Sequence, residues 1–508
     1  MQAFSSLKCE LLFVAILAYT ILFFIVTCIL DNGEVYLKLY DSVKNDIKDR
    51  IFSYPETETD AYIVSAYYYP ESKSLGDNAL AMVLLMNRNT MRDITKYRLN
   101  LVATNGITEI TSTATLLKES YSPCDYVNIV AKTNLLPGLT KLEIVSGDMK
   151  FNIPFKPART TAPSPVIICL SPQFVAEQWQ LFVAHAHVAR RFGGHLHLYV
   201  TSMVDSYFEL VQEYEKHGYV TIDFWIRMKF SNSSEPSLEP NSNTEFRNQA
   251  GAHTDCLLQY KEAVTFITFF DLDDVLFPRG FDSYFDEFAA YSFLYPHVQT
   301  FHYNRREFSI SNKASISEID IEELFGHSCY GVREDRGKLV ARPANLNSMW
   351  IHRSFNVLDK NTHVVKNNFL VHIQKPVDAD GTDPVPYGKS LYVEQDELQI
   401  NRTVLASIQL DFERMMRMSS IRYLESCLPA HSYFFSIIFK CYFDKYYAVP
   451  EKFKNSMCPN NEGCEIPQHP DLKCIHSDAE YISGPPMSPI RFHYHTNPQW
   501  SRNIGCYQ

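Results

Sequence analysis

The sequence predicts an α/β protein in which a Rossmann-type domain follows an N-terminal transmembrane helix and a small β-rich domain. Two patterns predict it: apolar runs alternate with helical spacing between residues 166 and 270, and a long uncharged run lies near the N-terminus. The chain has 508 residues, of which 46% are hydrophobic and 21% charged, and a net charge of −11. These values exclude a disordered chain or a coiled coil, and the acidic balance argues against nucleic-acid binding.

The N-terminal segment predicts a membrane anchor. Residues 11–30 carry no charge, and twenty helical residues span roughly 30 Å, the thickness of a bilayer core. A cleaved signal peptide, with a shorter apolar run, and a buried soluble helix are the alternatives. We expect a cytoplasmic tail at 1–10, an uncleaved anchor at 11–30 and a stem at 31–60. Lys and Arg counts mildly favour the opposite orientation, but sequons at Asn232 and Asn401 fit a lumenal body.

The segment at 61–155 predicts the small β-rich domain. Short β-rich runs alternate there with turn signals such as Asn105-Gly106 and Pro137-Gly138. The runs are Ala61–Tyr69, Ala79–Met86, Tyr97–Thr104 and Thr140–Ser146. Their spacing is typical of a β-sandwich-like domain. The proline-rich stretch from Pro154 to Pro165 predicts a linker to the next domain.

After the linker, from Val166 to Phe270, the pattern predicts alternating strands and helices. Strands are expected at Val166–Leu170, His195–Val200, Tyr219–Trp225 and Val264–Phe270, and helices at Glu177–Arg191, Ser206–His217 and Arg247–Lys261. This order predicts a parallel sheet with helices on both faces and a ligand at the carboxyl ends of the strands. Gly193 and Gly194 are expected to turn the chain, and Trp179 to lie in the core.

The fourth predicted strand ends in three aspartates, Asp271, Asp273 and Asp274. Carboxylates at the end of a buried strand are costly unless a cation neutralises them, and Mg²⁺ and Mn²⁺ prefer such oxygen ligands. The spacing directs Asp271 and Asp273 to the same side of an extended chain. We therefore expect these two to bind the metal with Asp274 as support; a solvated acidic turn is the alternative.

Two enzyme classes use such a carboxylate site. One is a GT-A-type glycosyltransferase, in which the metal bridges a nucleotide-sugar diphosphate; the other is a haloacid-dehalogenase-type phosphatase with Asp271 as nucleophile. The phosphatase motif normally follows the first strand of its domain, whereas three strand–helix units precede Asp271 here, and this favours the transferase. The later acidic run at 378–383 is interpreted as a plain turn, with a calcium loop or a second phosphatase motif as alternatives.

Several motifs between residues 164 and 440 occur in the order typical of glycosyltransferase family 92, which this region resembles. They are Ser171-Pro172, Glu177-x-Trp179, Phe192-Gly193-Gly194-His195, Leu198-Tyr199-Val200, Gln249-Ala250, Asp255-Cys256-Leu257, Phe270–Asp274, Met349–His352 and Val371–Gln374. The resemblance implies a GT-A-like Rossmann-type domain in a single-pass, type II Golgi membrane enzyme with a lumenal catalytic body. It implies metal-dependent, inverting transfer of a hexose, most simply galactose, from a UDP-sugar to an N-glycan or another glycoconjugate. A catalytically inactive, glycan-binding relative is the alternative.

The resemblance also implies roles for individual residues. Asp271 and Asp273 would hold Mn²⁺ or Mg²⁺ against the diphosphate of the donor, and Asp271 would also contact the donor. His372 is the first candidate for a third metal ligand and His352 the second. Arg247, expected at the start of a helix, would bind the diphosphate through its guanidinium. For each histidine and for the arginine, a purely structural role is the alternative.

Two features of the sequence leave their roles open. An inverting transfer needs a general base, and Glu318, Asp320, Glu322 and Glu323 crowd one segment, but helix-surface charge explains them equally well. The C-terminal extension at 441–508 holds five cysteines. Their density predicts local disulfides in an oxidising compartment, with a zinc site as the alternative.

Overall fold

The computed structural model describes most of the chain after the predicted stem. The described residues are 59–91, 94, 97–119, 123–230, 239–311, 313–326, 330–377, 392–393, 400–454, 457–460, 464–487, 489–502 and 506. The predicted tail and transmembrane helix, the sequon at Asn232 and the acidic run at 378–383 lie outside them. Among the helices that are described, none is long and apolar enough to cross a membrane.

The first sheet contains the predicted β-rich segment. Its strands run in the order β11-β19-β20-β1-β2-β5-β4-β3-β6-β7, and β8 pairs with β1. Their bounds are β1 Thr59–Tyr69, β2 Ala79–Asn87, β3 Leu99–Thr104, β4 Glu109–Lys118, β5 Tyr126–Asn134, β6 Lys141–Ser146, β7 Met149–Asn152, β8 Lys156–Pro157, β11 Ser202–Val204, β19 Cys474–Ser483 and β20 Ile490–Ser501. The four predicted strands are confirmed as β1, β2, β3 and β6. The partly exposed β4, which is rich in Ser and Thr, and the mostly buried β5 were not predicted.

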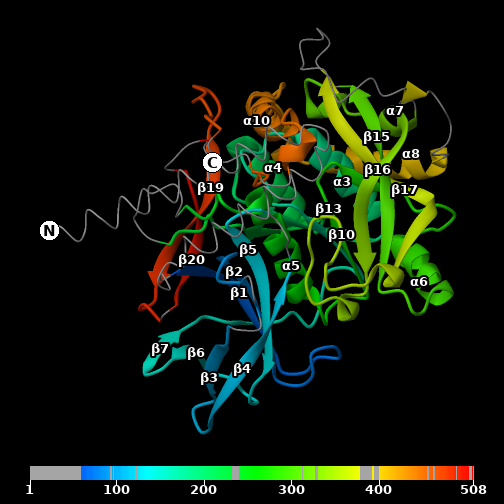
Figure 1. The fold of residues 1–508 in the computed structure, drawn as a ribbon. Coiled ribbons are helices and arrows are strands. Elements are labelled where there is room, and N and C mark those ends of the chain that lie inside the picture. Colours follow the sequence, from blue (N-terminus) through cyan, green and yellow to red (C-terminus); the bar gives the residue numbers. More distant parts are fainter. Residues whose placement is uncertain are drawn as a thin grey trace, which may run out of the picture. The chain divides into compact units, whose positions relative to one another are not determined.

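The C-terminal strands complete this sheet. β20 pairs in parallel with β1, with Ala61 opposite Phe492, and β19 pairs with β11 from the middle of the chain. In Figure 1 the red β20 accordingly lies beside the blue β1. Strands from the predicted β-rich domain, the predicted α/β domain and the C-terminal extension thus share one sheet. The domain boundaries at 155 and 440 stay a prediction.

The second sheet contains the parallel core that the sequence predicts. Its order is β12-β10-β9-β13-β16-β15-β17-β14, with β18 paired to β16. The bounds are β9 Val166–Leu170, β10 Gly194–Val200, β12 Val220–Phe224, β13 Phe266–Phe270, β14 Asp274–Leu276, β15 Thr300–Ser311, β16 Tyr330–Ala341, β17 Thr362–Val377 and β18 Tyr392–Val393. The first four strands in the order are parallel, as predicted, and β16 runs antiparallel to β13.

Helices cover both faces of the second sheet. The described α-helices are α3 Trp179–Arg191, α4 Asp205–Lys216, α5 Gln249–Tyr260, α6 Tyr284–Leu294, α7 Ile321–Gly326, α8 Arg402–Met416, α9 Ser419–Glu425, α10 Phe434–Tyr442 and α11 Glu451–Lys454. Alternate residues of β9 face opposite ways: Ile168 packs in a core with α3 and α4, and Ile167 in a core with α5. Trp179 is 1% exposed, which confirms its core position.

The turn between α3 and β10 depends on two glycines. Gly193 has φ +73°, a conformation that strains other residues, which confirms the predicted turn. A Cβ on Gly194 would lie 2.9 Å from Ile168 Cδ1, so a larger residue there would require the Ile168 side chain to shift.

Four disulfides join described cysteines: Cys441–Cys464, Cys474–Cys506, Cys124–Cys458 and Cys169–Cys256. The first two are local to the C-terminal extension, as predicted. The expectation fails for Cys458, whose partner lies 334 residues earlier in the first sheet. Because all five cysteines of the extension are bonded in pairs, the alternative of a zinc site there is wrong.

Candidate active site

The aspartate turn lies between two strands of the second sheet. β13 is buried along its whole length and ends at Phe270, and Asp274 begins β14. The Asp274 N–H donates to the Asp271 carbonyl at 3.1 Å, which closes the turn. β14 then pairs antiparallel with β17, and Asp274 lies directly opposite His372. Sheet pairing therefore brings together residues that are 98 positions apart.

Asp273, Asp274 and His372 form a compact cluster with ligand atoms within 4.8 Å of one another. His372 Nδ1 lies 2.9 Å from Asp274 Oδ1 and 3.8 Å from Asp273 Oδ1. Burial raises the pKa of Asp273, and the carboxylates of Asp274 and Asp271 add to this effect while His372 opposes it, so that the pKa lies at about 6. Burial lowers the pKa of His372, but the two carboxylates outweigh burial and raise it.

The donor set of this cluster fits a divalent cation. Two carboxylates and one imidazole are ligands that Mn²⁺ accepts, and Mg²⁺ accepts the carboxylates. Burial, and secondarily the neighbouring carboxylates, disfavour the ionised form of Asp273, and a bound cation would stabilise that form. The structure thus brings together the predicted ligands Asp273 and His372. Asp274, which was predicted only to support the ligands, is part of the same cluster.

Asp271 has different partners. Its Oδ2 lies 2.7 Å from Lys338 Nζ, and its Oδ1 accepts a hydrogen bond of 2.7 Å from Gln249 Nε2. The Lys338 side chain is fully buried, whereas the Asp271 side chain is 26% exposed. Burial raises the pKa of Asp271, but the adjacent ammonium outweighs burial and holds that pKa well below its usual range. Asp271 is therefore an ionised carboxylate beside the cluster, paired with a cation of the chain itself.

Arg247 lies in a strained turn before α5. The prediction that it begins the helix is wrong, because α5 begins at Gln249. Phe246, Arg247 and Asn248 have φ of 43°, 53° and 62°, and left-handed residues of this kind cost on the order of 1–3 kcal/mol each. The bonds that hold the turn include Phe246 N–H to the Pro459 carbonyl at 2.9 Å, Trp225 Nε1–H to the Arg247 carbonyl at 3.2 Å and Trp350 Nε1–H to Glu245 Oε2 at 2.7 Å.

The aspartate turn and the turn at Arg247 both border a cleft of about 400 Å³. It is lined by the loop from Ser171 to Gln178, by Asp271 and Asp273, by Arg247 and by α10. The Arg247 guanidinium stacks on the Phe174 ring with 3.8 Å between its carbon and the ring centroid. The cleft therefore offers acidic and cationic groups together at the carboxyl ends of β9 and β13, where the sequence predicts a ligand.

His352, the second candidate ligand, lines the cleft but lies outside the metal cluster. Its Nδ1 lies 2.9 Å from the Gly337 carbonyl, which can only accept, so Nδ1 carries the proton. Burial lowers the pKa of His352 to about 3, which leaves the ring neutral and Nε2 a hydrogen-bond acceptor. The carboxylates of Glu318, Asp320, Glu322 and Glu323 are exposed and do not line the cleft, which favours a helix-surface interpretation.

Sequence reasoning missed three residues of the site: Lys338, Arg305 and Gln249. Arg305 lines the cleft, and the charges of Asp274, Asp273 and Asp271 counteract burial to raise its pKa. One signal for Lys338 is present in the sequence, since a single lysine directly precedes the apolar run Leu339–Ala341. Nothing local indicates that these side chains face the aspartates, because sheet pairing and packing alone bring them there.

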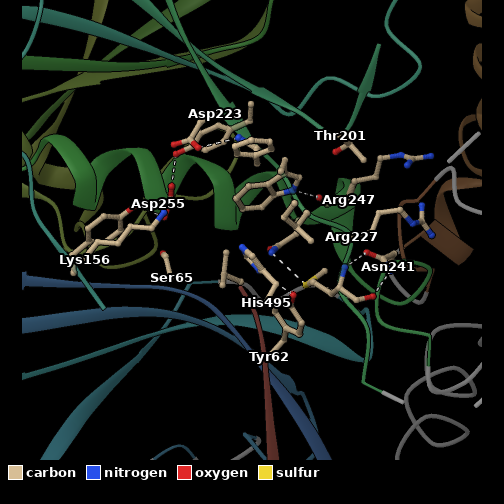
Figure 2. A pocket seen from close by; sticks show the side chains of 18 residues that line it. Tyr62, Ser65, Lys156, Thr201, Asp223, Arg227, Asn241, Arg247, Asp255 and His495 are labelled. Carbon is tan, nitrogen blue, oxygen red and sulfur yellow. Dashed lines mark hydrogen bonds between the residues drawn. The ribbon is translucent and has the colours of Figure 1, made fainter. Parts of the chain in front are cut away.

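A second, smaller cavity of about 50 Å³ lies between the first sheet and α5 (Figure 2). Asp255 accepts hydrogen bonds from the hydroxyls of Tyr67, at 2.9 Å, and Tyr199. His495 lies across the cavity, its Nδ1 3.0 Å from the Tyr62 hydroxyl. Such a volume holds a few waters and no sugar ring. Arg247 lines both cavities.

Comparison with known proteins connects this geometry to a family. Residues 164–416 match the model of glycosyltransferase family 92. The chain is similar to two Caenorhabditis elegans proteins. Glycosyltransferase family 92 protein ZK381.2 is 44% identical over 88% of this chain and 90% of its own length, and family 92 protein F55C10.4 is 39% identical over 96% and 95%. Among solved structures, S. aureus TarS 1-349 in complex with UDP-GlcNAc matches 43% of this chain and 61% of that one, at 10% identity and a TM-score of 0.21, too low to support an argument.

Proposed function

The chain belongs to glycosyltransferase family 92, and on this premise we propose that it transfers a hexose, most simply galactose, from a UDP-sugar to a glycan with inversion. The observation that carries the proposal is the cluster of Asp273, Asp274 and His372 at the edge of the cleft. The matched region includes the aspartate turn and His372, so the cluster belongs to the family's own domain. Family membership also favours a transferase over the phosphatase that the aspartate motif alone left open.

We propose that Asp273, Asp274 and His372 hold Mn²⁺ or Mg²⁺. When bound, such an ion supplies a Lewis acid that neutralises charge on the departing UDP. Arg247 and Arg305 line the same cleft and supply permanent positive charge for phosphate oxygens. Asp271 was predicted as both a metal ligand and a donor contact. Its ion pair with Lys338 favours the second role, since one of its oxygens already neutralises an ammonium.

We also propose that the protein is a type II Golgi membrane enzyme, anchored by residues 11–30, with its catalytic body in the lumen. The uncharged run, the four disulfides and the sequon at Asn401 support this location. Asn401 is exposed at the start of α8, where its Oδ1 accepts a hydrogen bond from the Thr403 N–H. An exposed position leaves its side chain accessible to a glycan.

The test is UDP release by the full-length protein across a set of UDP-sugars, with Mn²⁺ and with EDTA. We expect one UDP-hexose to give UDP in the presence of Mn²⁺ and no turnover with EDTA. Asp273→Asn should abolish turnover and weaken Mn²⁺ binding in calorimetry while the fold is kept. Asp148→Asn, at an exposed turn of the first sheet, is the matched control. Phosphatase turnover without UDP release would overturn the proposal, and Mn²⁺-dependent glycan binding without turnover would identify an inactive member.

A further inference from the structure

The wall formed by α10 and the following turn Phe443–Tyr447 brings an aromatic surface to the cleft. Phe435, Phe439, Tyr442 and Tyr447 line the cleft from this wall, and all four side chains are partly exposed. The rings of Phe435 and Phe439 lie one helical turn apart, with centroids 5.6 Å apart and planes 15° from parallel. An amphipathic helix normally turns its aromatic residues into the core. Here part of that face borders a polar cleft.

This aromatic wall is held in place by a buried carboxylate. Glu177 is 3% exposed, and its two oxygens accept the N–H groups of Tyr433 at 2.8 Å and Phe435 at 2.7 Å. Those are amides at the start of α10, where a negative charge also stabilises the helix dipole. Trp179 Nε1–H donates to the Pro429 carbonyl at 2.8 Å just upstream. The wall is therefore pre-organised by the loop and helix that follow β9.

The aromatic wall and the aspartate turn differ in chemistry. Asp271, Asp273, Arg247 and Arg305 on the polar side suit phosphate and metal, whereas the aromatic residues bring no charge to the cleft. Lys440, the lysine of α10, is 67% exposed and pairs with Asp444 at 2.6 Å. A ligand that fills both sides has a charged end and a neutral, flat end with an apolar face. A pyranose ring, with C–H groups on its faces and hydroxyls at its edge, has that second character.

We propose that the aromatic wall is the subsite for the acceptor glycan, with the ring of Phe439 stacked against the sugar that receives the hexose. This inference rests on the proposed function, because a pyranose acceptor is needed only by a transferase. A nucleobase has the same flat, neutral chemistry. The acceptor is favoured because the loop from Ser171 to Gln178 already provides a cleft wall at the carboxyl end of β9, the usual place of a nucleoside in such sheets.

The experiment compares Phe439→Leu, which keeps an apolar side chain but removes the ring, with Tyr423→Leu, a control at a 72% exposed tyrosine of α9 outside the cleft. Donor-site binding is measured as the Kd of UDP with Mn²⁺ by calorimetry. Acceptor use is measured as transfer from radiolabelled UDP-galactose to N-glycans released from Caenorhabditis elegans glycoproteins. We expect Phe439→Leu to raise the acceptor KM about tenfold, to leave the UDP Kd within twofold and to lose no more of the fold than the control. Phe439→Tyr should restore the KM.

Two results would overturn the inference. A weaker UDP Kd in Phe439→Leu would assign the wall to the nucleobase, and an unchanged acceptor KM would leave it a purely structural face. If Phe439→Leu fails to fold, Tyr447→Phe and Tyr447→Leu provide the same comparison one turn beyond α10. If the wild-type protein binds UDP but transfers nothing to any glycan, the proposed function fails and the acceptor subsite fails with it. If the wild-type protein releases UDP normally but Phe439→Leu and Tyr423→Leu have the same acceptor KM, the proposed function stands and the subsite does not.

Discussion

Replacing Lys338 by methionine should destabilise the protein and impair the site in the same step. The Lys338 side chain is fully buried on β16, and its ammonium lies 2.7 Å from Asp271 Oδ2 and 3.5 Å from the Ile351 carbonyl. Methionine has a similar length and no charge, so the variant leaves the Asp271 carboxylate with Gln249 as its remaining described hydrogen-bond donor. The carboxylate would then be an uncompensated charge at the floor of the cleft.

The expected loss of stability in Lys338→Met follows from the burial of its ion pair with Asp271. Removing one partner of a buried ion pair typically costs about 3–5 kcal/mol, because the other charge loses its compensation. The Asp271 side chain is 26% exposed, so water from the cleft would partly solvate it, and we expect the low end, about 3 kcal/mol. The pKa of Asp271 should rise, since burial opposes its charge and Lys338 is the main group that holds it down.

Urea denaturation at pH 7.5 measures this loss of stability. Lys141→Met removes an ammonium that is 50% exposed and lies 2.7 Å from Glu143, and it should change the free energy of unfolding by less than about 1 kcal/mol. The double variant Lys338→Met/Asp271→Asn should recover most of the loss, because both charges are then absent. A Lys338→Met protein within about 1 kcal/mol of wild type, or a double variant that shows the full sum of the single losses, would refute the reasoning.

Three further predictions concern the body of the protein. Replacing Cys169 and Cys256 by alanine opens a loop of 87 residues and should cost about 4 kcal/mol, seen as a lower urea midpoint than wild type; an unchanged midpoint would contradict it. Burial lowers the pKa of His197 and His253 to about 3, so both stay neutral in the fold, and stability should fall below pH 6.5 by up to roughly 1.4 kcal/mol per pH unit for each. His253→Phe should reduce that slope in urea titrations from pH 7.5 to 5.5, and an unchanged slope would count against it. Asn401→Gln should increase gel mobility after passage through a secretory pathway, and equal mobility before and after deglycosylation of the wild type would show that the sequon is not used.

Local sequence patterns predicted the strands and helices better than the contacts between them. β9 was predicted with its observed bounds because five consecutive apolar residues between turn signals leave little freedom. The aspartate turn and its place at the end of a parallel strand followed from the same patterns. His372 was the first candidate for a third ligand from the family resemblance, and the pairing of β14 with β17 brings it to Asp274.

The remaining features depend on contacts between distant parts of the chain. Lys338 and Asp271 are 67 positions apart, and hydrophobic periodicity reports whether a residue is buried, not which carboxylate it meets. The left-handed turn at Arg247 was predicted as the start of a helix, because the bonds from Pro459 and Trp225 that hold it come from distant parts of the chain. The partner of Cys458 was missed for the same reason.

The parallel pairing of β1 with β20 has a consequence for how the chain is made. Strand β1 leaves the ribosome more than 400 residues before its neighbour β20. Until then one edge of β1 has unpaired amides and carbonyls, which is a template for association with other chains. A nascent or truncated chain that lacks residues 490–501 therefore cannot close this sheet. We expect the protein to depend on chaperones that protect this edge during synthesis, and a premature stop near the C-terminus to be as damaging as one in the catalytic domain.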